Sequence, residues 1–511
     1  MMDPVGRRAG VLVGLAVVLT AGALGLVAWG PSPIGLDDWR WFRIAAPAWE
    51  SALVALVIYM LIGFATVVAC RRAGRQGRGG DAGVVALLAA LAFVAQVLAA
   101  KQLPGDYHES IIAIGKAGAN RYHTAAREVP DLRAVLGDYP HWMRQGSHKL
   151  IVTHPAGPLS LFWLLNHAFA GDEARAGRFV RWCEDRLAGG THVRDPGGPY
   201  AAFELFARMT NAEVAGAWLA TFALRLAASL LVLPVYAMAR RLHGRHAGLV
   251  AAGFSAVVPS LLLYSPGLDQ AFPVIAATAC WLGWTAGEFR SRWRAAAAGA
   301  TVAVGLFFSM SFAVVAAWAG LLALAALRRG AEPCSPRKLC ELLAAAGVGL
   351  VAPVAVLYMA FAYNSLAVWS ACLEANAKFN AQSGRVYWKW ALANPVEFLV
   401  FLGIPVSCLF LGRLVTAVRG LRKGWRDTDW GVLVIGGLLV ALNLLGLNRG
   451  EVSRLWMFLM PGCLVAAAAQ IESYAPYRRA VLVSLFALQA IQATVFKSLL
   501  DVLLGMYRGL G

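Results

Sequence analysis

The sequence predicts an all-α polytopic membrane protein with about thirteen transmembrane helices, and three observations carry that prediction. Hydrophobic residues make up 59% of the 511-residue chain, whereas charged residues make up only 14%. The mean hydropathy is +0.61. Apolar segments recur along the whole chain, and short basic connections separate them. Soluble domains are typically about 25% charged, so the composition excludes that class.

The apolar segments reach or approach the roughly 20 residues that a helix needs to cross a bilayer. The first one follows Arg7 and Arg8 and is too long for a signal peptide, so we expect an uncleaved helix. Ser309–Ser311 separates two segments that are short for two crossings but together too long for one. The segments lie at about 11–30, 51–69, 83–100, 214–239, 247–264, 270–287, 295–308, 312–328, 339–361, 396–417, 430–447, 456–472 and 480–496.

Basic residues concentrate in every second connection between the apolar segments. Short loops rich in Lys and Arg stay in the cytoplasm, so we expect a cytoplasmic N-terminus. The net charge of +18 comes largely from these short clusters, and their placement between apolar runs argues against nucleic-acid binding. The clusters are Arg7–Arg8, Arg71–Arg78, Arg240–Arg245, Arg290–Arg294, Arg328–Lys338, Arg419–Arg426 and Arg478–Arg479.

This alternation holds only if the apolar run Pro158–Ala170 does not cross the membrane. Its length of about 13 residues is that of an interfacial or re-entrant helix, so we expect it at the membrane surface. The loop 101–213, the corner 265–269, the loop 362–395 and the segment 448–454 then emerge together on the extracytoplasmic side. The polar residues that most need an explanation therefore share one face.

We expect two parts in the chain. Residues 1–82 form an N-terminal pair of transmembrane helices, and residues 83–511 form the membrane core with its long extracytoplasmic loop 101–213. Between the first two helices, Asp37–Trp41 is interpreted as an interfacial turn with a tryptophan anchor.

The stretch Leu103–Asn166 carries the polar and ionisable residues from which chemistry is expected. Asp106 follows the end of the third apolar segment closely, which places a carboxylate at the membrane boundary. A carboxylate there can have a raised pKa and can accept a proton from a hydroxyl, as a general base does. Glu109 would share a helical face with Asp106 and is the second candidate. The alternative for Asp106 is a helix cap or a solvated loop residue.

The same stretch contains the rigid turn Thr153–Pro158, whose two prolines fix the backbone. His154 in this turn can donate a proton or a hydrogen bond to a phosphate or hydroxyl group. Capping of the helix that follows is the alternative role. We assign four further residues of the stretch to substrate binding: Tyr107, Arg121, Tyr122 and Pro155. Zinc chemistry has little support, because no histidine pair has metal-ligand spacing.

Two charged residues outside this stretch are also assigned to substrate binding. Arg225 lies deep in an apolar segment, where an unpaired cation is costly, so it should face the bundle interior with a carboxylate or phosphate partner. A structural ion pair fits it equally well. Asp269 lies at the extracytoplasmic junction of two segments, where capping of the next helix is the alternative.

Two late segments add basic residues. Lys378 lies in a loop rich in aromatic residues, which suits a lipid headgroup or a sugar ring and equally suits an interfacial belt. Glu451 and Arg454 are spaced for pairing within one helical turn. Arg449 would then be left for a lipid phosphate, with a solvated loop as the alternative for the segment.

Taken together, these residues resemble the GT-C class of integral membrane glycosyltransferases over roughly residues 83–470. That class includes the protein mannosyltransferase and lipid A aminoarabinose transferase families. A carboxylate after an early helix and a long first extracytoplasmic loop contribute to the resemblance. The segment Asn448–Trp456 is similar to one in related bacterial transferases. The other matching segments are Thr153–Pro158, Phe162–Leu165, Tyr236–Arg245 and Leu262–Asp269.

The resemblance implies a polyprenyl-phosphate-linked sugar donor, inverting transfer on the extracytoplasmic side, and a catalytic Asp in the first large loop. Asp106 matches that Asp, and His154 matches the first residue of the class's His-Pro-Pro turn. Ala156 replaces the second proline of the turn. Two helices also precede the one that should be first, which leaves Asp37 and Asp38 as rivals to Asp106.

We therefore expect a glycosyltransferase of the bacterial cytoplasmic membrane that moves the sugar to a cell-envelope glycan, lipid or protein. His154 and Arg449, with Arg225 or Lys378, would stabilise the departing lipid phosphate. The sequence requires no cofactor, and a divalent metal that bridges phosphate and carboxylate stays open. The alternative is a transporter or flippase of lipid-linked glycan precursors. Transporters typically show repeated halves and midplane charges, whereas here the charges gather at one boundary.

Overall fold

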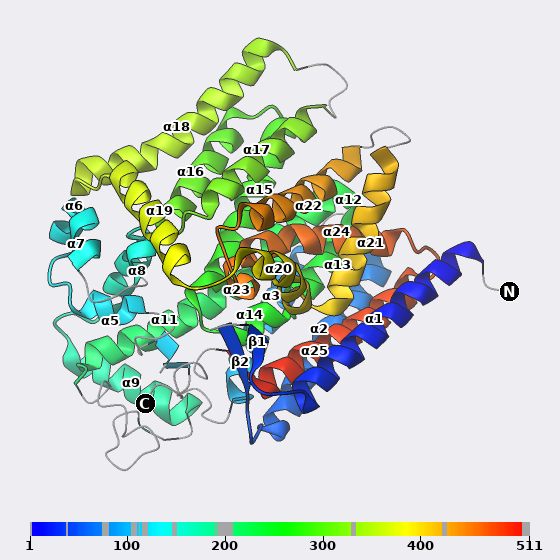
Figure 1. The fold of residues 1–511 in the computed structure, drawn as a ribbon, viewed down its shortest axis with the longest axis horizontal. Coiled ribbons are helices and arrows are strands. Elements are labelled where there is room, and N and C mark those ends of the chain that lie inside the picture. The colour runs from blue at the N-terminus through cyan, green and yellow to red at the C-terminus, as the bar shows by residue number, and fades with distance from the viewer. Residues whose placement is uncertain are drawn as a thin grey trace.

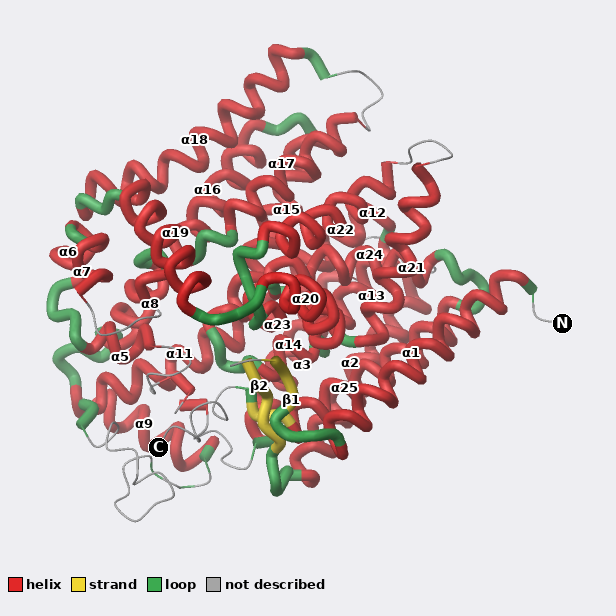
Figure 2. Tube along the Cα trace, in the orientation of Figure 1, coloured by secondary structure: helices red, strands yellow, loops and turns green. Residues whose placement is uncertain are grey.

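The computed structural model describes residues 3–36, 39–73, 81–103, 110–111, 113–114, 121–145, 151–188, 190, 192, 208–328, 334–421 and 427–502. Helices form almost all of it (Figures 1 and 2). The N-terminal elements are α1 (Pro4–Trp29), β1 (Ile34–Leu36), β2 (Trp39–Arg43), α2 (Trp49–Ala73) and α3 (Asp81–Lys101). The next elements are α5 (Arg121–Arg127), α6 (Leu132–Gly137), α7 (Tyr139–Gln145), the 3₁₀ helix η2 (Ile151–Thr153), α8 (Gly157–Asn166) and α9 (Glu173–Leu187).

The core and C-terminal elements follow. The core helices are α11 (Asn211–Leu230), α12 (Val232–His243), α13 (Arg245–Ser255), α14 (Pro259–Leu263), η3 (Leu268–Ala271), α15 (Phe272–Glu288), α16 (Arg292–Phe308), α17 (Phe312–Arg328) and α18 (Pro336–Phe361). The last elements are α19 (Ser365–Gln382), α20 (Tyr387–Leu402), α21 (Ile404–Leu421), α22 (Asp427–Leu445), α23 (Val452–Leu455), η4 (Met457–Leu459), α24 (Met460–Glu472), α25 (Arg478–Leu499) and β3 (Leu500–Asp501).

Eight helical segments of the described chain are long and apolar enough to cross a membrane, so the chain is a multi-pass membrane protein. Other segments predicted to cross are shorter apolar helices, among them α17 and α24. The predicted number of about thirteen crossings is therefore not confirmed by helix length alone. The segments themselves are found close to where the sequence places them; the prediction 339–361, for example, corresponds to α18.

The all-α prediction is wrong at one place, because three short strands form a small antiparallel sheet. Strands β1 and β2 make a hairpin, and β3 from the far end of the chain pairs with β2 through Arg43 and Leu500. Aromatic residues favour strands, and alternation places Trp39 inward, 2% exposed, while Arg40 is exposed. The predicted interfacial turn at Asp37–Trp41 is therefore partly strand, with Asp37 and Asp38 outside the described residues.

The predicted span 396–417 is not one helix. Gly403, with φ at +106°, separates α20 from α21, and L-residues avoid that backbone conformation. The predicted loop 362–395 is likewise mostly helical, because α19 and the first half of α20 occupy it. The sequence alone did not reveal the break, since the apolar run continues across it.

Helix α8 covers most of the apolar run Pro158–Ala170. At 10 residues it is about 15 Å long, only half of a hydrocarbon layer of about 30 Å, so it cannot cross. It packs against α5, α11 and α16 and buries Leu159 and Phe162 completely.

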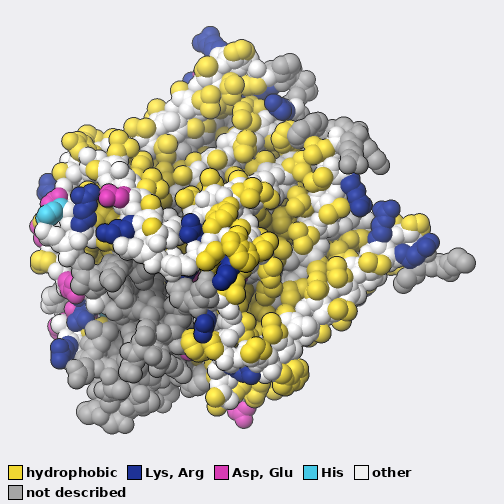
Figure 3. Space-filling view, viewed as in Figure 1, with side chains coloured by type: hydrophobic (Ala, Val, Ile, Leu, Met, Phe, Trp, Pro, Cys, Tyr) yellow, Lys and Arg dark blue, Asp and Glu magenta, His cyan; other side chains and the backbone are white. Residues whose placement is uncertain are grey.

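The helix ends form two distinct faces. One face, which we call the basic face, joins the ends of α12, α13, α15, α24 and α25 through ion pairs such as Arg241–Glu288 at 2.6 Å and Arg478–Glu472 at 3.4 Å. The opposite face, which we call the site face, carries the sheet, α5 to α9, α19 and α23. In Figure 1 the N-terminus lies at the right edge, on the basic face, and α5 to α9 lie along the left side. Figure 3 shows mostly hydrophobic side chains on the surface between them.

The two N-terminal helices pack directly on the rest of the bundle. Helix α1 contacts α21 and α25, and α2 contacts α3, α13 and α25. Close helix contacts elsewhere depend on small residues, as is usual between helices in lipid. At Gly349 on α18, an added Cβ would collide with the Ala296 carbonyl of α16. This packing holds the elements of the site face in fixed positions.

Candidate functional site

A chain of ion pairs joins three separate segments on the site face. The Arg454 Nε atom lies 3.3 Å from Asp269 Oδ2, and an Arg454 terminal nitrogen lies 2.8 Å from Glu451 Oε2. Glu451 Oε1 in turn lies 3.0 Å from a terminal nitrogen of Arg385. The pairing of Glu451 with Arg454 predicted from their spacing is confirmed. We call Asp269, Glu451, Arg454, Arg385 and Arg449 the charged cluster.

Arg449 completes the cluster through its backbone and side chain. Its carbonyl accepts a hydrogen bond from Arg385, and its own guanidinium donates to the Arg385 carbonyl at 2.9 Å. Its guanidinium also lies 6.0 Å from the Tyr387 ring centroid. Among the described residues, no carboxylate lies within ion-pair distance of Arg449, and its Nε atom is buried with no hydrogen-bond partner. Three arginines therefore face two carboxylates.

The backbone at the centre of the cluster is held in an uncommon conformation. Glu451 has φ at +62° and follows Gly450, whose φ is +88°. The left-handed region costs a residue with a Cβ roughly 1–2 kcal/mol, so ion pairs on both carboxylate oxygens are needed to hold it. Gly450 is packed so closely on Trp390 that a Cβ would lie 2.8 Å from that ring. The Gly450 amide donates to Asn394 Oδ1 at 3.0 Å.

His154 and Tyr122 form the next wall of the site. Their rings meet edge to face with centroids 5.8 Å apart, and Tyr122 stacks on Phe162 of α8. His154 Nδ1 lies 2.9 Å from the Thr153 hydroxyl. The Tyr139 hydroxyl donates to the carbonyls of the predicted turn, at 3.4 Å from that of His154. The turn is therefore held by α7 as well as by its own prolines.

The charges of His154 and of the charged cluster both affect the pKa of the Asp269 carboxyl. Burial raises the pKa of the Asp269 carboxyl, while the charges of Arg454 and His154 oppose the rise and the charge of Glu451 adds to it. Asp269 still keeps 17% of its side chain exposed. A carboxyl with a raised pKa beside cationic donors is a common feature of functional sites. The site can therefore hold an anion at its arginines and exchange a proton nearby.

Arg225 faces the bundle interior, as predicted, and ties the first loop to this region. It is completely buried on α11. A terminal nitrogen donates to Ser110 Oγ at 2.6 Å, and Nε donates to Ser265 Oγ at 3.2 Å. Ser265 belongs to the corner that leads to Asp269. The residue that follows Glu109 is thus fixed beside the corner that carries Asp269.

The structure places the remaining predicted site residues as follows. Pro155 is buried in the turn beside His154. Lys378 is exposed on α19, and none of the described ion pairs joins it to the charged cluster. Arg121 begins α5. The candidate bases Asp106 and Glu109, together with Tyr107, lie outside the described residues.

Sequence reasoning missed Glu397, a buried carboxylate on α20 directly beneath the cluster. Its Oε1 atom accepts hydrogen bonds from the Ser453 amide at 3.0 Å, the Ser453 hydroxyl at 2.6 Å and the Trp39 indole at 3.2 Å. Ser453 precedes Arg454, so Glu397 links the N-terminal hairpin to the charged cluster. An acidic residue within an apolar run was the available signal.

Two apolar grooves approach the site from different sides. The first, the α20 groove, has a volume of 630 Å³ and runs between α1, the hairpin, α20 and α25. Trp41 and Val396 line it, and Glu397 closes it toward Ser453. Both its apolar lining and its contact with the polar site suit a hydrocarbon chain that carries a polar head.

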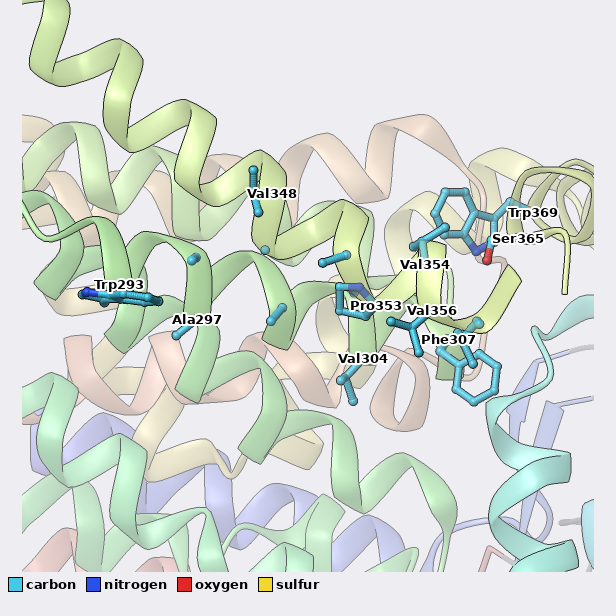
Figure 4. A pocket seen from close by; sticks show the side chains of 16 residues that line it. Trp293, Ala297, Val304, Phe307, Val348, Pro353, Val354, Val356, Ser365 and Trp369 are labelled. Atoms are coloured by element: carbon cyan, nitrogen blue, oxygen red, sulfur yellow. The ribbon is translucent and has the colours of Figure 1, made fainter. Parts of the chain in front are cut away.

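The second, the α18 groove, has a volume of 710 Å³ and runs between α16, α18 and α19. Figure 4 shows Trp293 at one end and Phe307 and Trp369 toward the other. The Phe307 ring lies 5.5 Å from that of Tyr363, whose hydroxyl accepts a hydrogen bond from the Ala156 amide at 3.2 Å. This groove therefore ends next to the turn that carries His154.

Within the described part of the chain, no group of three or more His, Cys, Asp or Glu residues is arranged to hold a metal ion. The charged cluster contributes two carboxylates, and each is already paired with arginine. The arrangement found there suits an anionic ligand, since guanidinium groups bind phosphate with two parallel hydrogen bonds.

No protein-family model matches the chain, and no curated protein matches it. Among solved structures, the chain is similar to the crystal structure of an oligosaccharyltransferase from Archaeoglobus fulgidus in complex with zinc and sulfate. The sequence identity is 13% and the TM-score is 0.33. The match covers 58% of this chain and 43% of the archaeal one, so this chain spans less than half of that enzyme. The function has to be inferred from the geometry of its own site.

Proposed function

We propose that the protein is a glycosyltransferase that moves a sugar from a polyprenyl-phosphate-linked donor to a cell-envelope acceptor on the extracytoplasmic side of the membrane. The observation that carries the proposal is the meeting of Arg449, Arg454 and His154 with Asp269 on one face of a membrane-embedded bundle. A polyprenyl phosphate needs cationic donors for its phosphate and an apolar groove for its hydrocarbon chain. The charged cluster supplies the donors, and the α20 and α18 grooves are apolar.

The arginines of the cluster indicate which substrate group it holds. Among the described residues, Asp269 and Glu451 pair with Arg454 and Arg385, whereas no carboxylate lies within ion-pair distance of Arg449. We therefore assign Arg449 to the phosphate, and its buried Nε is a donor that a phosphate oxygen would satisfy. A buried donor without a hydrogen bond destabilises the protein by roughly 1–3 kcal/mol. A bound phosphate would accept that hydrogen bond and remove the penalty.

The reaction follows from this placement of charge. The acceptor hydroxyl attacks the anomeric carbon of the sugar from the face opposite the phosphate, which inverts the configuration. The bond from that carbon to the phosphate oxygen breaks, and the polyprenyl phosphate leaves with the electron pair. Arg449, Arg454 and His154 stabilise the negative charge on the leaving group as it develops, where preorganised cations have their largest effect.

Asp106 takes the proton of the acceptor hydroxyl in this proposal, with Glu109 as the second candidate. The described residue that follows them in the sequence, Ser110, is anchored by Arg225 next to the corner that leads to Asp269. An aspartate at the membrane boundary can have the raised pKa that suits a general base.

The test of the base is the Asp106→Asn variant, with Glu109→Gln as its matched partner. Purified protein in liposomes would be supplied with a panel of polyprenyl-phosphate-linked hexoses and pentoses, and labelled sugar in the acceptor fraction would be measured. Asp106→Asn should lose at least about 100-fold in rate, as expected for a general base, while Glu109→Gln retains activity. Full activity of a well-expressed Asp106→Asn protein would rule Asp106 out as the base.

A further inference from the structure

A third groove lies at the opposite end of the bundle, on the basic face. It has a volume of 430 Å³ and runs between α2, α3 and α13. Its walls are apolar and open outward: Phe64 is 67% exposed and Leu87 is 50% exposed. The polar end of this α2 groove is formed by Arg72, Asp81 and Arg245, which lie at the ends of the three helices.

The Asp81 carboxylate at that end is paired with several neighbouring side chains. Asp81 is 3% exposed, and its carboxylate accepts hydrogen bonds of 2.6 Å from the Tyr236 hydroxyl and from Arg245 Nε. A terminal nitrogen of Arg240 lies 3.4 Å from the same carboxylate. Among the described residues, the guanidinium groups of Arg240 and Arg245 therefore share this one carboxylate.

Arg72 is the second arginine at the polar end of the groove. It lies in the last turn of α2 and is exposed. Among the described residues, no carboxylate lies within ion-pair distance of it. The α2 groove thus has apolar walls and a positive end, which is the pattern of an anionic lipid: an acyl chain that ends in a phosphate.

We propose that the α2 groove binds an anionic phospholipid, with its phosphate between Arg72 and Arg245 and one acyl chain along Phe64 and Leu87. Charge complementarity selects an anionic headgroup, because a zwitterionic lipid carries no net charge to offset Arg72. The outward opening of the walls selects a membrane lipid as the occupant. The bound lipid would join α2 to α3 and α13, and this site does not depend on the proposed transferase activity.

The test is native mass spectrometry of the full chain with phosphatidylglycerol and with phosphatidylcholine of the same acyl chains. Wild type should retain phosphatidylglycerol preferentially. Arg72→Gln should weaken that binding roughly fivefold, as expected for one basic residue near an anionic headgroup, and Arg72→Lys should keep most of it. Arg419→Gln is the matched control, because Arg419 lies exposed in the last turn of α21.

A second variant, Leu87→Trp, would fill the apolar walls without changing charge and should also displace the lipid. Unfolding temperatures in phosphatidylcholine alone would confirm that each variant is folded. Equal retention of both lipids by wild type would overturn the proposal, as would equal losses in Arg72→Gln and Arg419→Gln. Displacement of the lipid by millimolar inorganic phosphate, with no effect of Leu87→Trp, would also overturn it by showing a plain phosphate site.

Discussion

The Asp269 carboxylate and the Arg454 guanidinium, which belong to distant parts of the chain, lie 3.3 Å apart on the site face. Their side chains are 17% and 23% exposed, so solvent screens the pair only in part. Asp269 comes from the corner before α15 and Arg454 from α23. The pair therefore connects the middle of the chain with its late segment at the proposed reaction centre.

We predict that this pair is energetically coupled. In the double variant Asp269→Asn/Arg454→Gln, the loss in free energy of unfolding should be smaller than the sum of the two single effects by about 1 kcal/mol. Thermal unfolding in a double-mutant cycle measures the coupling. Additive losses would show that the two side chains make no net interaction.

Replacement of Arg449 should affect ligand binding more than stability. In Arg449→Gln the cluster loses the arginine that has no carboxylate within ion-pair distance among the described residues. The affinity for a polyprenyl phosphate should therefore fall about tenfold or more, since hydrogen bonds to charged groups contribute about 1.5–3 kcal/mol. Arg449→Lys keeps the charge but loses the planar donor geometry, so its affinity should lie between those of wild type and Arg449→Gln. Equilibrium binding in detergent measures the effect. An unchanged affinity of Arg449→Gln would remove Arg449 from the phosphate site.

Acid should destabilise the first loop through His123. This side chain is fully buried on α5, and its Nε2 atom lies 3.0 Å from the Glu213 carbonyl. Burial lowers the pKa of His123 to about 4, whereas unfolded histidine titrates near 6.5. In that interval the unfolded chain binds the extra proton, so stability present above about pH 6.5 is lost as the pH falls toward 4, by up to about 3 kcal/mol.

His123→Gln, whose amide can still donate to the Glu213 carbonyl, should lack this loss. Subtracting its unfolding profile from that of wild type isolates the histidine. Asp269 has the opposite sign, because its raised pKa favours the folded state as the pH falls. A wild-type profile parallel to that of His123→Gln between pH 7 and 4 would contradict the prediction.

Glu397 should be more important to the fold than a single carboxylate usually is. Glu397→Ala leaves three donors from Ser453 and Trp39 without their acceptor, and each buried unpaired donor costs roughly 1–3 kcal/mol. Glu397→Gln keeps a carbonyl oxygen and should be much milder. Thermal unfolding compares the two, with Trp39→Phe as a variant that loses one donor only. Equal stability of the Ala and Gln variants would contradict this role.

The sequence predicted that several residues of the candidate site share one face, but it did not predict all of their contacts. Alternating basic connections placed Asp269, His154, Glu451 and Arg454 on one face, and the structure brings these four together. This could be predicted because the length of an apolar segment and the charge of a loop are both properties of the local sequence. The pairing of Arg385 with Glu451 could not be predicted, since that contact depends on how α19 and α20 pack against the rest of the chain.

The missed features share a cause. Glu397 belongs to an apolar run that continues past Gly403, so hydropathy merged the end of α20 with α21. The strand pairing of β2 with β3 joins the two ends of the chain, and no local pattern encodes such a partner. The mixture of aromatic and basic residues around Lys378 suggests a binding site, yet Lys378 is exposed on α19 and none of the described ion pairs joins it to the cluster.

The most direct test of the account is the initial rate of sugar transfer from polyprenyl-phosphate donors in proteoliposomes, for wild type, Arg449→Gln, Arg454→Gln and the control Arg133→Gln. Arg133 lies exposed on α6, outside the charged cluster. Loss of a donor to the developing charge should lower the rate about 100-fold or more in both cluster variants, while the control keeps the wild-type rate. Wild-type rates in both cluster variants, or no transfer by wild type from any donor of the panel, would contradict the central claim.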